Sequence, residues 1–169
     1  MTISFSTCDF CDAHKDDASG MLRVLPPIFH SYGAAPSFAG TIVTVRCHED
    51  NSVVKQVLEQ EAGQGRVLVV DGGGVLQRAL VGGKIAAAAA RNGWAGLVVY
   101  GAVRDQLELA STLLGIRALA LVPMPTSRAG QGQRDVPVQV QGVLLRPGEW
   151  LYADADGIVV AERPLHTVS

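Results

Sequence analysis

The spacing of apolar residues in the middle of the chain predicts strands and helices that alternate. Continuous apolar runs, as expected of strands buried on both faces, occupy residues 66–70, 97–100 and 118–122. Between them, residues 85–90 form an alanine-rich helical segment and residues 104–114 a shorter helical pattern. The order strand, helix, strand, helix, strand predicts a parallel sheet with right-handed crossovers.

The flanking segments predict further elements, and towards the C-terminus the apolar runs become shorter. The first third of the chain predicts, in order, a helix capped by Thr7, loops at 25–27 and 33–40, a strand at 41–45 and a helix from Asn51 to about Glu61. Beyond residue 122 the apolar runs become short and turn residues separate them, which is typical of a β-meander. These runs are residues 136–140, 142–145, 150–152 and 158–160. We therefore expect one α/β domain over residues 1–169, with a central parallel βαβ part and an added β-meander layer.

Composition narrows the class of protein. Charged residues make up 18% of the chain, below the roughly 25% that is usual for soluble domains, and hydrophobic residues make up 48%. This apolar share, with a net charge of only −2, argues against intrinsic disorder. The near-neutral charge, without clusters of Lys or Arg, argues against direct binding of nucleic acid. The shortage of surface charge favours a surface that other subunits partly cover.

We expect a cytoplasmic protein that does not enter a membrane. No run of apolar residues approaches the ~18 that are needed to span a bilayer. Residues 1–6 have neither the basic start nor the long apolar run of a secretory signal.

The cysteines suggest metal or redox chemistry only superficially. Cys8 and Cys11 form a Cys-x-x-Cys motif, but a structural zinc site needs four ligands and no second pair exists. A thioredoxin-like motif would lie inside a βαβ unit rather than near the chain start. With Cys47 the number of cysteines is odd, which argues against a disulfide framework. We interpret residues 8–11 as the first turns of a helix.

Three glycine-containing segments follow predicted strands and are candidates for ligand binding. Ligands collect at the carboxyl ends of parallel strands, where loops and helix N-termini present N–H groups. The segments are residues 71–74, 82–84 and 101–105, and we expect them to converge on one cleft. Their glycines fit neither a dinucleotide fingerprint nor a P-loop, so exposed N–H groups would serve a smaller anion such as a carboxylate. The alternative for Gly82-Gly83 is a tight turn between closely packed elements.

Arg104-Asp105 is the most informative pair of side chains. Arg offers a planar fork that matches a carboxylate, and Asp is a hard oxygen ligand for Mg²⁺ or Mn²⁺. Neighbours on a regular helix diverge, so both side chains reach one ligand only if the backbone is irregular there. The alternative is an ordinary helix-start Asp beside a surface Arg.

Five segments resemble, in the same order, the family of regulator of ribonuclease activity A (RraA), which includes the class II 4-hydroxy-4-methyl-2-oxoglutarate aldolases. These segments are residues 49–51, 66–74, 78–80, 92–104 and 151–158. The resemblance is collinear and covers nearly the whole chain. It implies a single-domain β/β/α swivelling-type fold, a homotrimer with active sites between subunits, and a divalent metal cofactor, Mg²⁺ or Mn²⁺.

The resemblance also implies two functions. Aldolase members cleave 4-hydroxy-4-methyl-2-oxoglutarate, a small 2-oxo acid, to two pyruvates, and they decarboxylate oxaloacetate; a pyruvate enolate serves both reactions. In the alternative, regulator members bind and inhibit ribonuclease E without chemistry. For this chain the resemblance implies that Arg104 holds the substrate, that Asp105 holds the metal, and that both act in catalysis. It assigns binding of the substrate carboxylate to the backbone of Gly82, Gly83, Lys84 and Ile85.

One position departs from the aldolase pattern. The aldolases resemble one another in an Asp, twenty residues and then Arg-Asp, and in this chain Gly83 stands at the first acidic position. This departure concerns the ordering of the metal shell through water and the transfer of a proton, whereas backbone donors do not depend on the side chain. In the regulator branch the residue after the Arg is not acidic, so Asp105 favours the enzyme.

Overall fold

The structure, a computed structural model, describes residues 3–168. The helices in this part of the chain are α1 (Thr7–His14), α2 (Ser52–Gln60), α3 (Gly83–Arg91) and α4 (Gln106–Ala110). The strands are β1 (Leu22–Val24), β2 (His30–Ser31), β3 (Phe38–Arg46), β4 (Val67–Asp71), β5 (Ala79–Val81), β6 (Gly96–Val103), β7 (Gly115–Leu121), β8 (Gln133–Arg134), β9 (Val138–Val140), β10 (Val143–Leu145), β11 (Trp150–Ala153) and β12 (Ile158–Ala161).

One large sheet organises the fold. Its strands follow the order β1-β12-β11-β3-β4-β6-β7-β2, with β5 beside β6 and β8 beside β3. The central pairs β3–β4, β4–β6, β6–β7 and β5–β6 are parallel, while β12, β11 and β1 extend the sheet in antiparallel fashion. The predicted parallel βαβ part and the added β layer are therefore both confirmed.

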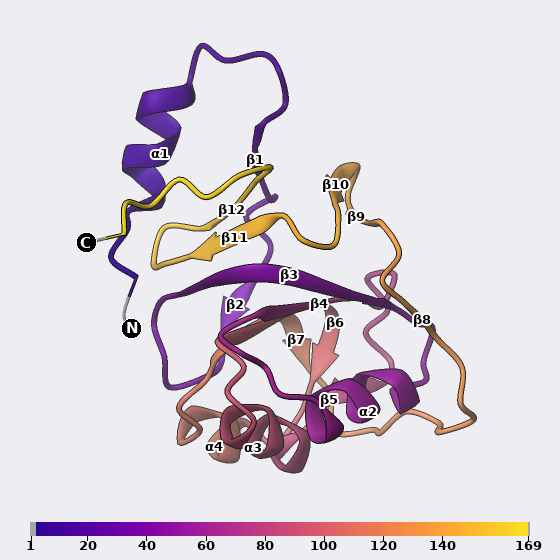
Figure 1. The fold of residues 1–169 in the computed structure, drawn as a ribbon. Helices are drawn as coiled ribbons and strands as arrows, with labels where there is room; N and C mark the ends of the chain where they lie inside the picture. The colour runs from indigo at the N-terminus through magenta and orange to yellow at the C-terminus, as the bar shows by residue number, and fades with distance from the viewer. Residues whose placement is uncertain (1–2, 169) are drawn as a thin grey trace.

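Two apolar cores lie on opposite faces of the parallel strands. Helices α2, α3 and α4 gather on one side of the sheet, as Figure 1 shows, and side chains such as Leu68 and Leu97 point towards them. On the other face Val67, Val69 and Val98 pack with residues of β9, β10, β11 and β12. Burial on both faces explains why these strands read as uninterrupted apolar runs.

The alanine run forms a helix that lies close against the sheet. Ala86 and Ala89 are fully buried in the helix-side core, because small side chains let a helix backbone approach its neighbours. The helix ends as predicted, with Asn92 at the C-cap and Gly93 in the left-handed conformation that commonly follows a helix. It begins earlier than the expected residue 85, at Gly83.

The predicted cap of α1 is wrong by one residue. Ser6 is the N-cap, and its hydroxyl accepts a hydrogen bond from the N–H of Asp9. Thr7 instead uses its N–H and hydroxyl to bind the carboxylate of Asp154, at 2.8 and 2.7 Å. A long-range carboxylate therefore competes successfully for the residue that local sequence favours as a cap.

Element boundaries differ most around residues 101–121. The strand expected to stop at Gly101 continues to Val103, and the helix expected over 104–114 is only Gln106–Ala110. The next strand begins at Gly115 rather than at residue 118. Likewise β3 begins at Phe38, inside the segment expected to be a loop. Pairing with neighbouring strands extends these elements beyond what local propensity predicts.

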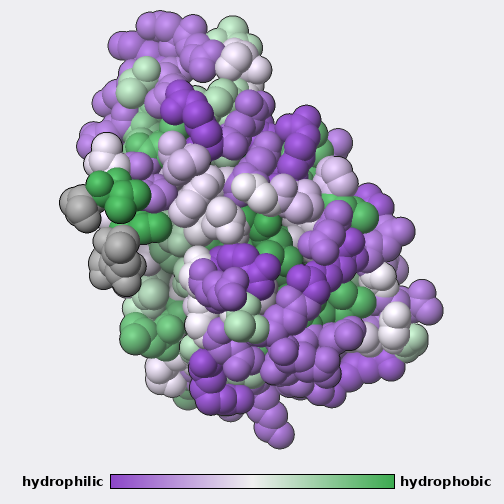
Figure 2. Space-filling model, in the orientation of Figure 1, coloured by the Kyte–Doolittle hydropathy of each residue, from purple (hydrophilic) through white to green (hydrophobic). Residues whose placement is uncertain are grey.

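The surface around α1 is mostly hydrophilic on the face that Figure 2 presents. Within residues 3–168 no helix has both the length and the apolar character needed to cross a membrane.

Candidate functional site

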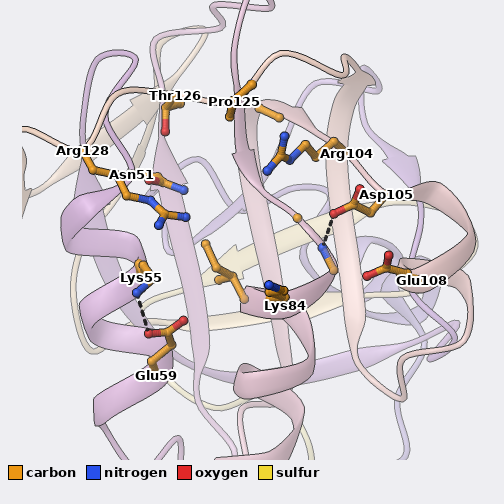
Figure 3. A pocket seen from close by; sticks show the side chains of 14 residues that line it. Asn51, Lys55, Glu59, Lys84, Arg104, Asp105, Glu108, Pro125, Thr126 and Arg128 are labelled. Atoms are coloured by element: carbon orange, nitrogen blue, oxygen red, sulfur yellow. Dashed lines mark hydrogen bonds and ion pairs between the residues drawn. The ribbon is translucent and has the colours of Figure 1, made fainter.

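A cleft of about 820 Å³ opens beside the carboxyl ends of β5 and β6. Its walls come from α2, the first turn of α3, the start of α4 and the segment after β7, as seen in Figure 3. The lining residues are Asn51, Lys55, Glu59, Ala79, Gly82, Gly83, Lys84, Ile85, Arg104, Asp105, Glu108, Pro125, Thr126 and Arg128. The cleft therefore lies where open α/β sheets usually bind ligands.

The sequence-predicted site residues meet in this cleft. Both side chains of the Arg104-Asp105 pair line it, and so do all four residues of the 82–85 segment. Their roles in binding and catalysis stay predictions.

An unusual backbone conformation lets Arg104 and Asp105 reach the same space. Asp105 has φ 67° and ψ 52°, the left-handed region that a non-glycine residue enters at a cost of about 1–2 kcal/mol. The N–H of Arg104 still pairs with the carbonyl of Val81 at 3.0 Å, so the chain turns sharply only after that residue. The irregularity that the sequence argument required is present.

The carboxylate of Asp105 caps the start of α3. Its Oδ2 accepts a hydrogen bond of 2.8 Å from the N–H of Gly83. The N–H groups of Lys84 and Ile85, in the same first turn, have no backbone acceptor within residues 3–168. Two helix N–H groups therefore remain for an anion, and the positive end of the helix favours a negative charge there.

Close approach also explains the glycine at position 82. A Cβ atom on Gly82 would lie 2.8 Å from Asp105 Oδ2 and 3.3 Å from Arg104 Nε. Any side chain here would push these two groups away. The sequence left two explanations for Gly82, a tight turn between packed elements and a role in the site. Both hold, because the groups packed against Gly82 are the side chains of Arg104 and Asp105.

One of the three predicted glycine-containing segments, residues 71–74, does not line this cleft. The N–H groups of Gly72 and Gly74 both donate to the carbonyl of Tyr100, and the N–H of Gly73 donates to Asp71 Oδ1. Since β6 and Asp71 already engage these donors and the loop does not line the cleft, the expectation that this loop joins the ligand site is wrong.

Six further polar residues, which the sequence did not reveal as site residues, line the cleft: Asn51, Lys55, Glu59, Glu108, Thr126 and Arg128. Asn51 occupies the expected N-cap position of α2 but makes no capping bond through its side chain. It instead donates from Nδ2 to the carbonyl of Leu80 at 3.0 Å, while its buried Oδ1 has no partner in the described residues. Thr126 Oγ1 is also buried without a partner. Motifs could not reveal these residues, since five of the six lie far from the Arg-Asp pair in sequence.

Asp50 fixes the loop that carries Arg128. Its Oδ1 binds the N–H and hydroxyl of Ser52, at 2.8 and 2.6 Å, and its Oδ2 accepts from the N–H groups of Ala129 and Gln131. Burial raises the pKa of Asp50, but these hydrogen bonds outweigh it and lower the pKa to about 2. The start of α2 and the 128–131 loop are therefore held together by an ionised, buried carboxylate.

The carboxylate that Asp105 presents in the cleft suits a weakly held divalent cation such as Mg²⁺. No group of three or more His, Cys, Asp or Glu side chains that could hold a metal occurs among residues 3–168. Mg²⁺ usually keeps several waters and takes only one or two carboxylates, with substrate oxygens completing its shell. Asp105, which uses one oxygen on Gly83, fits that mode of binding, whereas a closed zinc site does not fit.

The Cys-x-x-Cys segment lies in α1, as expected. The negative charge of Asp156 raises the pKa of the Cys8 thiol, and burial raises the pKa of Cys11. Both shifts favour the neutral thiol over the thiolate that binds metal or attacks disulfides.

Comparison with known proteins agrees with this geometry. The profile of the RraA-like family, described as Aldolase/RraA, matches residues 7–160. A protein of Albidiferax ferrireducens, provisionally named a 4-hydroxy-4-methyl-2-oxoglutarate aldolase, is 59% identical over 95% of this chain and 97% of its own length.

Two solved structures are similar over almost the whole chain. One, described as the RNA-processing inhibitor RraA from Thermus thermophilis, has a TM-score of 0.89 and 44% identity, covering 96% of this chain and 95% of its own. The other, described as an S-adenosylmethionine: 2-dimethylmenaquinone methyltransferase from Geobacillus kaustophilus, has a TM-score of 0.88 and 40% identity, with coverages of 95% and 97%. The names of these relatives state different activities, but all three proteins match almost the whole length of this chain. The chain belongs to the RraA-like (Aldolase/RraA) family.

Proposed function

We propose that the protein is a metal-dependent carbon–carbon lyase that cleaves 4-hydroxy-4-methyl-2-oxoglutarate to two pyruvates and decarboxylates oxaloacetate as a side reaction. The observation that carries this proposal is the convergence of Arg104, Asp105 and two free N–H groups of α3 in one cleft. The name of the Albidiferax relative supports the same reaction.

Each part of the cleft has a role in this reaction. Asp105 would hold Mg²⁺ or Mn²⁺, which supplies Lewis-acid polarisation of the 2-oxo group when it is bound. The N–H groups of Lys84 and Ile85 bind a substrate carboxylate at the positive end of α3. Arg104 directs its guanidinium at the oxygen on which negative charge develops during cleavage. A preorganised donor of this kind is commonly worth about 3 kcal/mol, or roughly a hundredfold in rate.

The charge of the cleft suits a dicarboxylic acid. Lys55 is paired with Glu59 at 3.1 Å, so Lys84, Arg104 and Arg128 remain as cations against Asp105 and Glu108. With a divalent cation the cleft carries an excess of positive charge. Two carboxylates of a 2-oxo acid would offset most of this excess.

The test is release of pyruvate from 4-hydroxy-4-methyl-2-oxoglutarate and from oxaloacetate, followed with lactate dehydrogenase while Mg²⁺ is titrated. We expect turnover of both substrates that rises with Mg²⁺ and stops with EDTA. Absence of turnover of both substrates at every Mg²⁺ concentration would contradict the proposal.

A second candidate function is regulation of a ribonuclease by direct contact. It rests on the 44% identity with a protein described as an RNA-processing inhibitor. A pull-down with ribonuclease E separates the two candidates: binding without metal-dependent turnover would favour the regulator.

We also propose that the protein acts as a homotrimer. Leu107 and Leu113, in and just after α4, are 87% and 81% exposed in the single chain. Large apolar side chains beside a cleft are typical of surfaces that another subunit covers.

A further inference from the structure

A second cavity, of about 590 Å³, lies towards the amino end of β7, whereas the cleft lies at the carboxyl ends of β5 and β6. The two share no lining residue. The volume of this second cavity falls within the range of about 300–1,000 Å³ that is usual for sites of small ligands. Its wall combines apolar residues, among them Val24, Pro26 and Phe29, with the charged side chain of Arg117.

Arg117 brings a buried positive charge to the wall of this cavity. The residue is 5% exposed, and its guanidinium donates to Ser31 Oγ at 2.9 Å and to the carbonyls of Pro36 and Asp154 at 2.7 and 3.3 Å. Its Cζ atom lies 5.3 Å from the centroid of the Phe38 ring. All of these partners are uncharged groups, and a guanidinium has five N–H donors, so these three hydrogen bonds do not use them all.

The charge of Arg117 is not matched by an acid in direct contact. Within residues 3–168, Arg117 forms no ion pair with a carboxylate. The carboxylate of Asp154 is bound instead by the N–H and hydroxyl of Thr7 and by the N–H groups of Asp156 and Gly157. Burial lowers the pKa of Arg117, and the negative charge of Asp154 offsets this only in part. Buried arginines are usually paired, and an anion in the cavity would supply the missing partner.

The rest of the wall limits what this anion carries. Val24, which is 54% exposed, and Phe29 offer apolar surface that an apolar ligand body would cover. Pro26 and Pro27 have fixed φ angles, which makes this part of the wall rigid. Asp156, an exposed acid that lines the same cavity, disfavours a second negative charge on the ligand.

We propose that this cavity binds a small carboxylic acid with one negative charge and an apolar body, and that Arg117 holds its carboxylate. The planar fork of a guanidinium matches the two oxygens of a carboxylate. A dicarboxylic acid, the kind of substrate proposed for the cleft, does not suit this cavity. The two sites therefore differ in position and in ligand, and this proposal does not depend on the proposed lyase activity.

The test uses benzoate as the probe, with benzyl alcohol and isophthalate for comparison, and measures each dissociation constant by calorimetric titration. Benzyl alcohol keeps the ring without the charge, and isophthalate adds a second carboxylate. We expect benzoate to bind at least about tenfold more tightly than benzyl alcohol, since a hydrogen bond to a charged group commonly contributes that much. Isophthalate should bind more weakly than benzoate, because Asp156 repels its second carboxylate.

Two variants change the cavity itself, and circular dichroism checks that each is folded. Arg117→Gln removes the positive charge and should weaken benzoate binding at least about tenfold. Val24→Glu adds a negative charge to the exposed part of the wall and should weaken it at least about threefold. Because Val24→Glu leaves the hydrogen bonds of Arg117 in place, it tests the site even where Arg117→Gln does not fold.

Two further variants are controls. Val168→Glu makes the same substitution at a position that is 75% exposed and lies outside the cavity. Arg104→Gln removes a positive charge from the cleft. We expect both to bind benzoate with the wild-type dissociation constant.

Four results would overturn the proposal. The first is the absence of saturable benzoate binding to the wild type, and the second is equal affinity for benzoate and benzyl alcohol. The third is wild-type affinity for benzoate in Val24→Glu or in folded Arg117→Gln. The fourth is loss of binding in Arg104→Gln, which would place benzoate in the cleft instead.

Discussion

At the residue scale, two adjacent glycines admit charged groups to the start of one helix. Gly82 leaves room for the side chains of Arg104 and Asp105, and Gly83 leaves room for Glu108. Neither glycine has a left-handed backbone, so their value lies in the missing Cβ atom rather than in conformational freedom. Small residues here bring two acids and a guanidinium within reach of the N–H groups of α3.

Replacing Gly83 by alanine should displace the Glu108 carboxylate while leaving the fold intact. The end of a glutamate side chain is flexible and can move, so we expect the melting temperature to fall by only a few degrees. Cleavage of 4-hydroxy-4-methyl-2-oxoglutarate should fall at least about tenfold, since the displaced carboxylate lines the cleft and a small misplacement in a site commonly costs that much or more. Steady-state kinetics and thermal unfolding monitored by circular dichroism provide both measurements.

Gly157→Ala is the matched control for this variant. A Cβ at position 157 meets nothing within 4 Å, and its backbone is not left-handed. We expect unchanged activity in this control. Unchanged cleavage in Gly83→Ala as well would show that the close contact between position 83 and Glu108 does not matter for the site.

At the element scale, the cleft depends on how α2 and the segment after β7 are tied together. Asp50 links the N-terminus of α2 to the N–H groups of Ala129 and Gln131, and Arg128 immediately precedes the first of these contacts. Asn51, the next residue, ties α2 to the end of β5 through Leu80. Two neighbouring residues thus set two walls of the site.

The substitution Asp50→Asn should destabilise the protein in a pH-dependent way. The amide places an NH₂ group against backbone donors, which should cost about 1–3 kcal/mol at pH 7. The pKa of Asp50 is lowered to about 2, below the usual 3.8. Its stabilising effect is therefore complete above about pH 4 and is lost as the pH falls towards 2. Urea unfolding at pH 7 and at pH 2.5 should reveal a difference that shrinks in acid.

The exposed Asp12 offers a comparison for this measurement. Asp12→Asn should change stability by less than about 0.5 kcal/mol at either pH. A stability difference for Asp50→Asn that is the same at both pH values would contradict the role of the ionised carboxylate.

Sequence patterns predicted the central elements because strands that are buried on both faces consist of uninterrupted apolar residues. The apolar runs in β4 and β6 and the alanine run in α3 required no knowledge of distant residues. No such apolar run marks the short strands β1, β2, β5 and β8, since only their pairing with remote strands defines them. The cap of α1 failed for the same reason, because Asp154 determines what Thr7 does.

Some residues of the candidate site could likewise be predicted from the sequence, and others could not. Arg104 and Asp105 are neighbours, so a motif could identify them together. Asn51 and Thr126 reach the cleft only through the crossing of chain segments, and their spacing in sequence does not predict it, whereas Glu108 follows Asp105 by three residues. The contact between Gly83 and Glu108 joins residues on two different helices.

At the scale of the whole molecule, the low charge of the chain and the exposed leucines near α4 point to assembly. We predict that light scattering coupled to size exclusion will give a mass about three times the 17.8 kDa of one chain. Leu107 and Leu113 should contribute, so replacing Leu113 by glutamate should lower that mass because a charge would enter an apolar contact. A wild type that elutes with the mass of a single chain at micromolar concentration would contradict this assembly.

The central claim is that the cleft at Arg104 and Asp105 performs metal-dependent carbon–carbon cleavage. The most direct measurement is the Mg²⁺-dependent rate of pyruvate release from 4-hydroxy-4-methyl-2-oxoglutarate by the wild type and by Asp105→Asn. We predict that the wild type turns over only with metal and that Asp105→Asn loses at least about 100-fold in kcat/KM, because loss of even an outer-shell partner of a metal commonly costs about 10- to 100-fold. Full metal-dependent release of pyruvate by Asp105→Asn would contradict it.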